Sequence, residues 1–473
     1  MRHADEEQAS FHMPGHKGWD FFEREGYGEL FRRIPNLDIT EIPGADNLFK
    51  AEGIIKNLMN RYRRYYGAEK SYLLINGSSA GIVASIMAVI KPGERLIMDR
   101  SSHKSVTNGL ALAGGEPVYI YPEFMREYGL PGEMKVETVK EALDKNPDAR
   151  AVFITSPNYY GVCSDIEAIS EVVHSRGKVL IVDQAHGAHL NLFCDTGMLS
   201  SGVMDAERSG ADIVINSIHK TMASFTQTAV LNVCTGTVSG SKIRDALQMV
   251  QSSSPSYLMM LSLELNMDIA EKNGKKLAER WIENSFNFRE QAEKIEGLKI
   301  MNHPRLDPSK LNLDMSELGI SGMELAKRLM DRGIYTEMDR GCVCLAMTGI
   351  GNRDEDYNLL LEALREIAEE GRIEDSCDVT KMPYSIQDSG MGNLSGAQDF
   401  AAGYAEEWEK VHWSFATGRT SARPVVPYPP GIPLIVRGEI IDRKVLEYAV
   451  SLVESGCKVS GMDGNGFLYC YKK

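Results

Sequence analysis

The stretch "GADIVINSIHKTM", residues 210–222, joins an apolar run to a charged end. Residues 211–215 are rich in Ile and Val and are bounded by glycine and small polar residues, which is typical of a buried strand in a parallel sheet. His219 and Lys220 follow directly. A lone Lys at a strand exit is most often a solvated surface residue, but the carboxyl ends of strands are also where open α/β sheets bind ligands. The rest of the chain decides between these interpretations.

Further runs of this kind recur before and after the opening stretch, and helical patterns separate several of them. Strands are predicted at 71–75, 94–99, 117–121, 151–155, 178–183, 212–216 and 229–233, and helices at 54–66, 79–90, 136–145, 165–176 and 257–295. Alternation of this kind predicts an α/β fold with a mostly parallel seven-stranded sheet covered by helices. We expect an N-terminal arm at 1–50, a large domain at 51–290 and a smaller α+β domain at 291–473.

Composition limits the classes of function. The 473 residues carry a formal net charge of -14, which argues against a nucleic-acid surface and is compatible with a cationic small molecule. No apolar run reaches the roughly 18 residues of a membrane span, and the first residues lack the apolar core of a secretory signal, so a cytoplasmic protein is expected. The eight cysteines show no metal-binding spacing, and no metal is predicted.

Four loops that follow predicted strands carry complementary chemical groups. "NGSSAG" (76–81) opens a helix with Ser78 and Ser79, "RSSHKS" (100–105) supplies His103, "DQAHGAHL" (183–190) supplies Asp183 and His186, and the opening stretch supplies Lys220. Alone, each has a plain structural explanation, such as a helix cap. Together they offer an anion cradle, a flat imidazole, a carboxylate and an amine. Pyridoxal 5'-phosphate needs this set, because the amine forms a Schiff base and the carboxylate keeps the pyridine nitrogen protonated.

The sequence resembles the ornithine/lysine/arginine decarboxylases of the aspartate-aminotransferase fold over nearly its whole length. The segments that carry the resemblance are "HMPGHKG" (12–18), "DITEIPGADNL" (38–48), "NGSSAG", "DRSSHKSVTNGL" (99–110), "TSPNYYGV" (155–162), "DQAHGAHL", "NSIHKTM" (216–222), "QSSSPSYLMMLSLE" (251–264) and "PYPPGIPLIVRGE" (427–439). The resemblance implies a fold type I enzyme that depends on pyridoxal phosphate. It is similar to the short branch that lacks an N-terminal wing domain.

The resemblance also implies a role for each matching residue. Lys220 would be the Schiff-base lysine, Asp183 the partner of the pyridine nitrogen, and His103 the imidazole that stacks on the ring. The residues that would hold the phosphate are Ser78, Ser79, Ser217 and His219. His186 would line the site beside the ring. Ser253 would reach the phosphate of a neighbouring subunit, because the family builds its sites across a dimer interface. A homodimer, or a larger homo-oligomer built from dimers, is therefore expected.

The chain departs from the family pattern at two positions. The family commonly has Glu where Gln184 stands and Thr where Ile218 stands. Neither change removes a group with an expected catalytic role, but both leave open a diverted reaction. The expected activity is decarboxylation of a basic L-amino acid, arginine first and lysine or ornithine next. An aminotransferase, a cyclising or an eliminating enzyme on the same scaffold is the alternative, and a non-catalytic binding protein is a remote one.

The substrate contacts are the least defined part of this prediction. Asp46 and Glu439 are candidates for the distal cationic end of the substrate, with ordinary surface charge as the competing explanation. An aminotransferase would hold the substrate carboxylate with an Arg, and Arg423 and Arg437 are available in the C-terminal domain. The sequence does not assign either arginine to a site.

Overall fold

The computed structural model describes residues 8–200, 202–371, 407–428, 431–454 and 457–472. The first seven residues of the predicted arm, residues 372–406 of the predicted C-terminal domain, and Pro429 and Pro430 of the motif at 427–439 lie outside the described residues. The chain divides into two compact units. Unit 1 comprises Met1–Gly81, Ser156–Ser170 and Val182–Val379, and unit 2 comprises Ile82–Thr155, Glu171–Ile181 and Thr380–Lys473. The domain ranges inferred from the sequence stay predictions.

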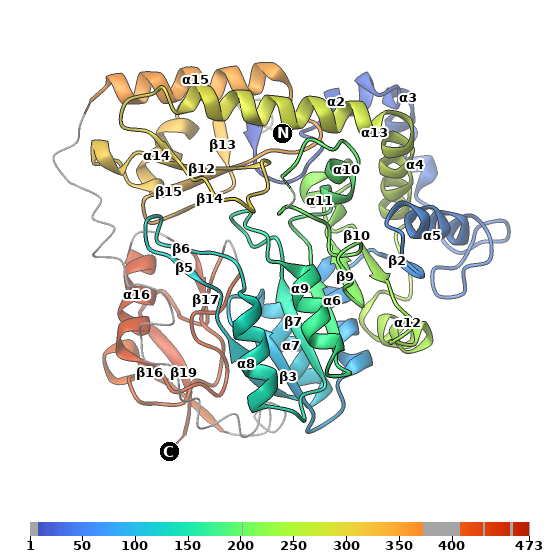
Figure 1. The fold of residues 1–473 in the computed structure, drawn as a ribbon, viewed down its shortest axis with the longest axis horizontal. Coiled ribbons are helices and arrows are strands. Elements are labelled where there is room, and N and C mark those ends of the chain that lie inside the picture. Colours follow the sequence, from blue (N-terminus) through green and yellow to red (C-terminus); the bar gives the residue numbers. More distant parts are fainter. Residues whose placement is uncertain (1–7, 201, 372–406, 429–430, 455–456, 473) are drawn as a thin grey trace. The chain divides into compact units, whose positions relative to one another are not determined.

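In the described part of the chain, seven strands form one sheet in the order β2-β10-β9-β8-β7-β3-β4 (Figure 1). The strands are β2 (Lys70–Leu74), β3 (Arg95–Asp99), β4 (Glu116–Ile120), β7 (Ala151–Thr155), β8 (Val179–Asp183), β9 (Ile213–Asn216) and β10 (Ala229–Val233). β3 pairs in parallel with β4 and β7, whereas β10 is antiparallel to β2 and β9. Every residue of β8, β9 and β10 is buried, as expected for strands covered on both faces. The predicted mostly parallel α/β fold is confirmed.

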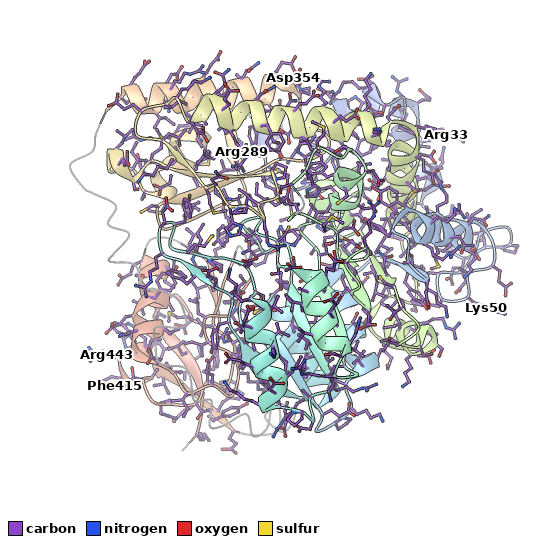
Figure 2. All side chains as sticks on the ribbon, viewed as in Figure 1. Arg33, Lys50, Arg289, Asp354, Phe415 and Arg443 are labelled. Carbon is purple, nitrogen blue, oxygen red and sulfur yellow. The ribbon has the colours of Figure 1, made fainter. Side chains whose placement is uncertain are left out.

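Helices connect these strands. They are α5 (Ile54–Tyr65), α6 (Gly77–Val89), α7 (Lys104–Ala113), α8 (Val136–Lys145), α9 (Ile166–His174), α10 (Leu190–Cys194), α11 (Ile218–Thr221), α12 (Gly240–Val250) and the long α13 (Tyr257–Ala292). Those at 54–65, 77–89, 136–145, 166–174 and 257–292 lie where the sequence predicts a helix, whereas those at 104–113, 190–194, 218–221 and 240–250 were not predicted. A short hairpin of β5 (Phe124–Met125) and β6 (Leu130–Pro131) follows β4. Arg289 near the end of α13 donates to the main-chain carbonyls of Met301 and Lys310, which ties this helix to the strands that follow it (Figure 2).

A second, smaller sheet lies in the later part of unit 1. Its order is β11 (Lys299–Ile300), β12 (Lys310–Asp314), β15 (Val343–Met347) and β14 (Met338–Arg340). α14 (Gly322–Met330) and α15 (Asp354–Glu369) belong to the same part, and α15 runs beside α13 (Figure 1). The N-terminal segment joins this region, because β1 (Ala9–Phe11) pairs in parallel with β13 (Ile334–Thr336). The short helices α2 (Trp19–Arg24), α3 (Gly28–Phe31) and α4 (Ile34–Leu37) follow it.

The C-terminal segment of unit 2 is built from short strands and one helix. β16 (Trp408–His412) pairs with β19 (Phe467–Tyr471), β17 (Val426–Pro427) pairs with β18 (Val459–Ser460), and α16 (Arg443–Glu454) carries the apolar residues that pack on them. This mixture is the α+β composition expected for the C-terminal part of the chain.

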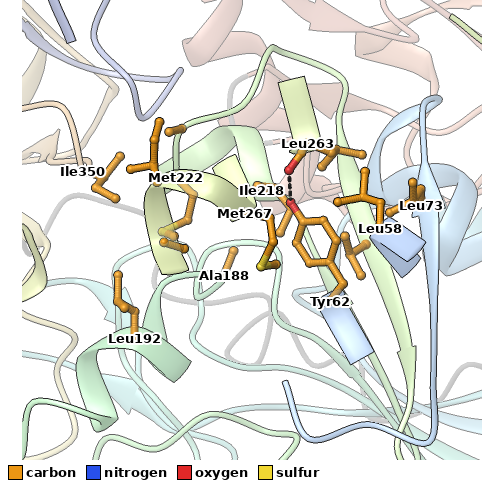
Figure 3. Packing of buried hydrophobic residues seen from close by; sticks show 14 of the residues in the cluster. Leu58, Tyr62, Leu73, Ala188, Leu192, Ile218, Met222, Leu263, Met267 and Ile350 are labelled. Carbon is orange, nitrogen blue, oxygen red and sulfur yellow. Dashed lines mark hydrogen bonds between the residues drawn. The ribbon is translucent and has the colours of Figure 1, made fainter. Parts of the chain in front are cut away.

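The largest apolar cluster of unit 1 surrounds Tyr62, whose hydroxyl donates to the carbonyl oxygen of Leu263 at 2.8 Å (Figure 3). Ile218 and Met222 belong to this cluster, and their side chains are 0% and 1% exposed. They stand on either side of Lys220 in the sequence. Burial of one such side chain contributes about 1.5–3 kcal/mol, so this packing anchors the short helix that carries the lysine.

Candidate active site

Lys220 lies on α11, directly after β9, and its backbone is fixed by close packing. The main-chain N–H of Gly15 donates to the carbonyl oxygen of His219 at 2.8 Å. A side chain at position 15 would place a Cβ 2.2 Å from the carbonyl carbon of Thr221, so only glycine permits this approach. The N-terminal motif at 12–18 therefore packs against the lysine-bearing helix of its own chain.

The Lys220 amine contacts the imidazole of His186. Lys220 Nζ and His186 Nε2 lie 2.8 Å apart, within hydrogen-bond distance. Burial lowers the pKa of Lys220, while the carboxylates of Asp183 and Glu337 act to raise it and the ammonium of Lys310 acts to lower it. A lowered pKa increases the fraction of uncharged amine, which is the nucleophilic form.

Asp183 ends β8 and is 4% exposed. Its Oδ1 accepts a hydrogen bond from the main-chain N–H of Ala185 at 3.0 Å. Burial raises the pKa of Asp183, while the charge of Lys220 and the bond from Ala185 act to lower it. A buried carboxylate of this kind gains stability from a cationic partner, which a protonated ring nitrogen would supply.

Two residues that were not predicted as site residues, Tyr159 and Glu337, form a chain of contacts that begins at His186. The ring of Tyr159 lies 4.3 Å from the His186 ring, centroid to centroid, and its hydroxyl donates to Glu337 Oε1 at 2.7 Å. Glu337 Oε2 also accepts from the main-chain N–H of Met13 at 3.0 Å. Tyr159 lies inside the family-like segment at 155–162, which could have pointed to it. Glu337 stands in "IYTEMDR", which carries no recognisable pattern.

The residues expected to hold a phosphate gather where α6 and α11 begin. Ser78 and Ser79 are the second and third residues of α6, and the Ser217 hydroxyl donates to Ser78 Oγ at 2.8 Å. Small side chains at a helix N-terminus are suited to binding an anion. The ring of His219 is held differently: its Nδ1 donates to the carbonyl oxygen of Thr228 at 2.9 Å, and burial lowers its pKa to about 4.

His103 and Ser253 lie at a helix start and in a connection, respectively. His103 is the N-cap residue of α7 in unit 2, where its Nδ1 accepts from the main-chain N–H of Ser105 at 3.2 Å. This role fixes the ring in place. Ser253 is exposed in the connection between α12 and α13 of unit 1. The roles predicted for both residues stay predictions.

The two predicted substrate carboxylates are both used in local structure. Asp46 accepts hydrogen bonds from five main-chain N–H groups, which belong to Asn47, Glu52, Gly53, Ile55 and Lys56. Burial acts to raise the pKa of Asp46, but these hydrogen bonds outweigh it and hold the pKa below its usual value. Asp46 therefore caps the beginning of α5, and any contact with substrate would compete with this role.

Glu439 forms a buried ion pair in unit 2. Its Oε2 lies 3.1 Å from Arg100 Nη2, and the two side chains are 1% and 2% exposed for Arg100 and Glu439. Removing either partner would leave an unpaired buried charge, which is strongly destabilising. Arg423 and Arg437 lie in the same unit, where Arg423 packs over the ring of Tyr469 and Arg437 donates to the hydroxyl of Tyr471. Glu439, Arg423 and Arg437 therefore each have a structural contact within unit 2.

The chain is similar to known decarboxylases in sequence and in structure. A model of the Orn/Lys/Arg decarboxylase major domain matches residues 1–313, and one of the C-terminal domain of that family matches residues 387–465. A Bacillus subtilis (strain 168) protein named arginine decarboxylase is 31% identical over 97% of this chain and 94% of its own length. A Halalkalibacterium halodurans protein of the same name is 31% identical over 99% and 95%. The constitutive lysine decarboxylase of E. coli superposes with a TM-score of 0.76 at 22% identity, covering 99% of this chain and 81% of that one. Within the described residues, no helix combines the length and apolar character that crossing a membrane requires.

Proposed function

The chain belongs to the Orn/Lys/Arg decarboxylase family, and we propose that it removes the α-carboxyl group of a basic L-amino acid, arginine being the first candidate. Arginine comes first because relatives that carry the name arginine decarboxylase match nearly the whole chain. The observation that carries the proposal is the position of the Lys220 amine. Its Nζ contacts His186 Nε2, and the charges of Asp183 and Glu337 act on its pKa.

The residues around Lys220 fit pyridoxal phosphate. An amine with a lowered pKa, a buried carboxylate that accepts from the main-chain N–H of Ala185, and serine hydroxyls at a helix N-terminus suit its aldehyde, its ring nitrogen and its phosphate, respectively. When bound, this cofactor accepts the electron pair that the departing carbon dioxide leaves behind. Lys220 would hold the aldehyde carbon, and Ser78, Ser79 and Ser217 would hold the phosphate.

Asp183 and His186 would act on either side of the lysine. Asp183 would keep a proton on the ring nitrogen, since its carboxylate ends a strand with one main-chain donor and little solvent. His186 would accept a proton from the Lys220 amine or return one to it across the 2.8 Å contact. His103 is proposed to stack on the ring, as the resemblance implies.

Glu337 is the acidic group that we propose for the distal cation of the substrate. Its carboxylate accepts from Tyr159, whose ring packs on His186, and its charge acts to raise the pKa of Lys220. The Tyr159 hydroxyl donates to Glu337 Oε1, and the main-chain N–H of Met13 donates to Glu337 Oε2. Each carboxylate oxygen can accept a further hydrogen bond. A planar guanidinium could use the remaining capacity, so Glu337 is better placed for this role than Asp46 or Glu439.

A homodimer with shared sites is also proposed, and it now depends on the exposed Ser253 connection. The N-terminal segment does not add to this support, because residues 9–15 bind their own chain through β13, α11 and Glu337. A cytoplasmic location likewise stays a prediction.

The proposed function is tested by supplying purified protein and pyridoxal phosphate with L-arginine, L-lysine or L-ornithine and measuring both carbon dioxide and the product amine. Equal amounts of both products from arginine are expected. Lys220→Ala should abolish turnover, because no other amine stands at that position. Borohydride reduction followed by peptide mapping should find the cofactor on Lys220. Keto-acid formation without carbon dioxide, or an adduct on a different lysine, would overturn the proposal.

A further inference from the structure

An ammonium–carboxylate pair lies buried beside the loop that carries His186. Lys310 begins β12 and Asp307 precedes it by three residues. Both side chains are 0% exposed, and Lys310 Nζ lies 3.2 Å from Asp307 Oδ2. Removing such charges from water is unfavourable unless hydrogen bonds satisfy the remaining polar atoms. The hydrogen-bond partners of Lys310 and Asp307 therefore indicate which part of the chain the pair positions.

Each of the three donors of the Lys310 ammonium has an acceptor. Besides Asp307, Nζ donates to Ser309 Oγ at 2.9 Å and to the main-chain carbonyl oxygen of His186 at 3.2 Å. A Lys ammonium has three N–H donors, so the side chain is fully satisfied. One of the three bonds leaves the local segment and fixes the main chain of the residue that contacts Lys220.

The carboxylate of Asp307 holds the same loop at a second point. Its Oδ1 lies 3.1 Å from His189 Nε2 and accepts from the main-chain N–H of Ser309 at 2.9 Å. Burial lowers the pKa of His189, while the carboxylate of Asp307 acts to raise it. Burial acts to raise the pKa of Asp307, but its interactions with His189 and Lys310 outweigh burial and hold that pKa well below its usual range. The pair is therefore bound to the loop at both 186 and 189.

The surrounding backbone is shaped for the lysine side chain. Gly161 has φ +94°, and a Cβ there would lie 2.7 Å from Lys310 Cγ. A larger residue would block the path of the side chain and would also strain the backbone. Arg289 of α13 donates to the Lys310 carbonyl oxygen at 2.5 Å (Figure 2), which fixes the start of β12.

We infer that Lys310 is a positioning residue for Lys220, because its bond to the His186 carbonyl fixes the imidazole that contacts the Lys220 amine. The inference rests on the proposed function only in taking Lys220 as the reactive amine. The ammonium of Lys310 also acts on Lys220 directly: after burial, its positive charge helps to lower the pKa of that amine, opposed by Asp183 and Glu337. Both effects favour an uncharged amine held on His186.

The test measures how fast acetic anhydride labels Lys220 in the cofactor-free protein as a function of pH, read by peptide mass spectrometry. Lys310→Met removes the charge at nearly constant volume, and Lys310→Met with Asp307→Asn also removes the carboxylate that would be left unpaired. Both variants should move the labelling profile to higher pH and slow labelling on its rising limb by about threefold or more, since a unit of pKa is a factor of ten. Lys294→Met removes an exposed lysine of the same unit, whose side chain is 62% exposed, and should leave the profile unchanged.

A purely structural role would lower the unfolding midpoint without moving the labelling profile of the folded protein. A folded variant with the native profile would therefore overturn the inference. Failure of both variants to fold would also overturn it, because the pair would then serve stability alone. The outcome is separable from the proposed function: a shifted profile together with no release of carbon dioxide from any of the three amino acids would overturn the proposed activity and leave the role of Lys310 intact.

Discussion

The pH dependence of stability should change sharply when Gln184 is replaced by Glu, the residue that the family commonly has there. The Gln184 side-chain amide donates to Glu207 Oε2 at 2.8 Å and to Asn216 Oδ1 at 3.0 Å. Asn216 and Asn232 donate to the other oxygen of Glu207. Burial, and then the charge of Asp205, raises the pKa of Glu207 to about 7, with the asparagine hydrogen bonds acting to lower it. Gln184→Glu would place a second carboxyl group against this one.

The magnitude follows from the protons that the folded state must hold. In the native protein Glu207 binds a proton more tightly when folded than when unfolded, so its contribution to stability is full below its usual value of 4.5 and is lost as the pH rises to about 7. A second buried carboxyl adds a second such proton over the same window. We expect a loss of about 1 kcal/mol at pH 5 from the missing amide donor. The loss should then grow by about 1.4 kcal/mol per pH unit, or about 2.7 kcal/mol between pH 5 and pH 7.

Urea unfolding of the cofactor-free native and variant proteins at pH 5, 6 and 7 measures this difference. The matched control exchanges the two groups, Gln184→Glu with Glu207→Gln, which restores one carboxyl and one amide. Its unfolding midpoints should run parallel to those of the native protein as the pH changes. A loss of stability in Gln184→Glu that is the same at all three pH values would refute the reasoning, because it would show that the new carboxyl stays ionised without cost.

Two further predictions concern the site itself. Asp183→Asn removes the charge that would stabilise a protonated ring nitrogen, so turnover should fall by several orders of magnitude while some pyridoxal phosphate stays bound, as absorbance of the purified variant would show; a near-native rate would mean that another residue contacts that nitrogen. Mixing inactive Lys220→Ala chains with inactive Ser253→Tyr chains should recover up to about a quarter of native activity, because random pairing makes half of the dimers hybrids with one complete site each. Hybrids that form but stay inactive would place Ser253 outside the partner's site.

The fold could be predicted closely because its central strands are buried on both faces. Strands that are buried on both faces have nearly continuous apolar sequences, such as "VLIVD" at 179–183 and "IVIN" at 213–216. Such runs can be predicted as strands from the local sequence. The order of the strands was not predicted, since it depends on crossovers rather than on composition. Lys220, Asp183 and His186 could be predicted as site residues because each follows a strand and lies in a family-like segment; their roles stay predictions.

Other members of the site could not be found locally. Glu337 meets Tyr159 across 178 positions of sequence, and Lys310 meets the His186 carbonyl across 124. Nothing in "TEMDR" or "DPSK" indicates those contacts. Asp46 shows the opposite case: it stands in a family-like segment and its carboxylate caps α5, while its predicted contact with substrate stays a prediction. Residues that are brought together only by tertiary contacts cannot be predicted from local sequence patterns.

The packing of Gly15 constrains the order in which the chain can be assembled during synthesis. This residue is made before its partners: its main-chain N–H donates to the carbonyl of His219, and its own carbonyl accepts from the main-chain N–H of Gly351. Its neighbour strand β1 pairs with residues 334–336. Synthesis proceeds from the N-terminus at about 5–20 residues per second, so these partners appear tens of seconds after the segment that needs them. The segment around Gly15 therefore reaches its final position long after it is made, and the lysine-bearing helix acquires its final support only when the chain has been translated past residue 351.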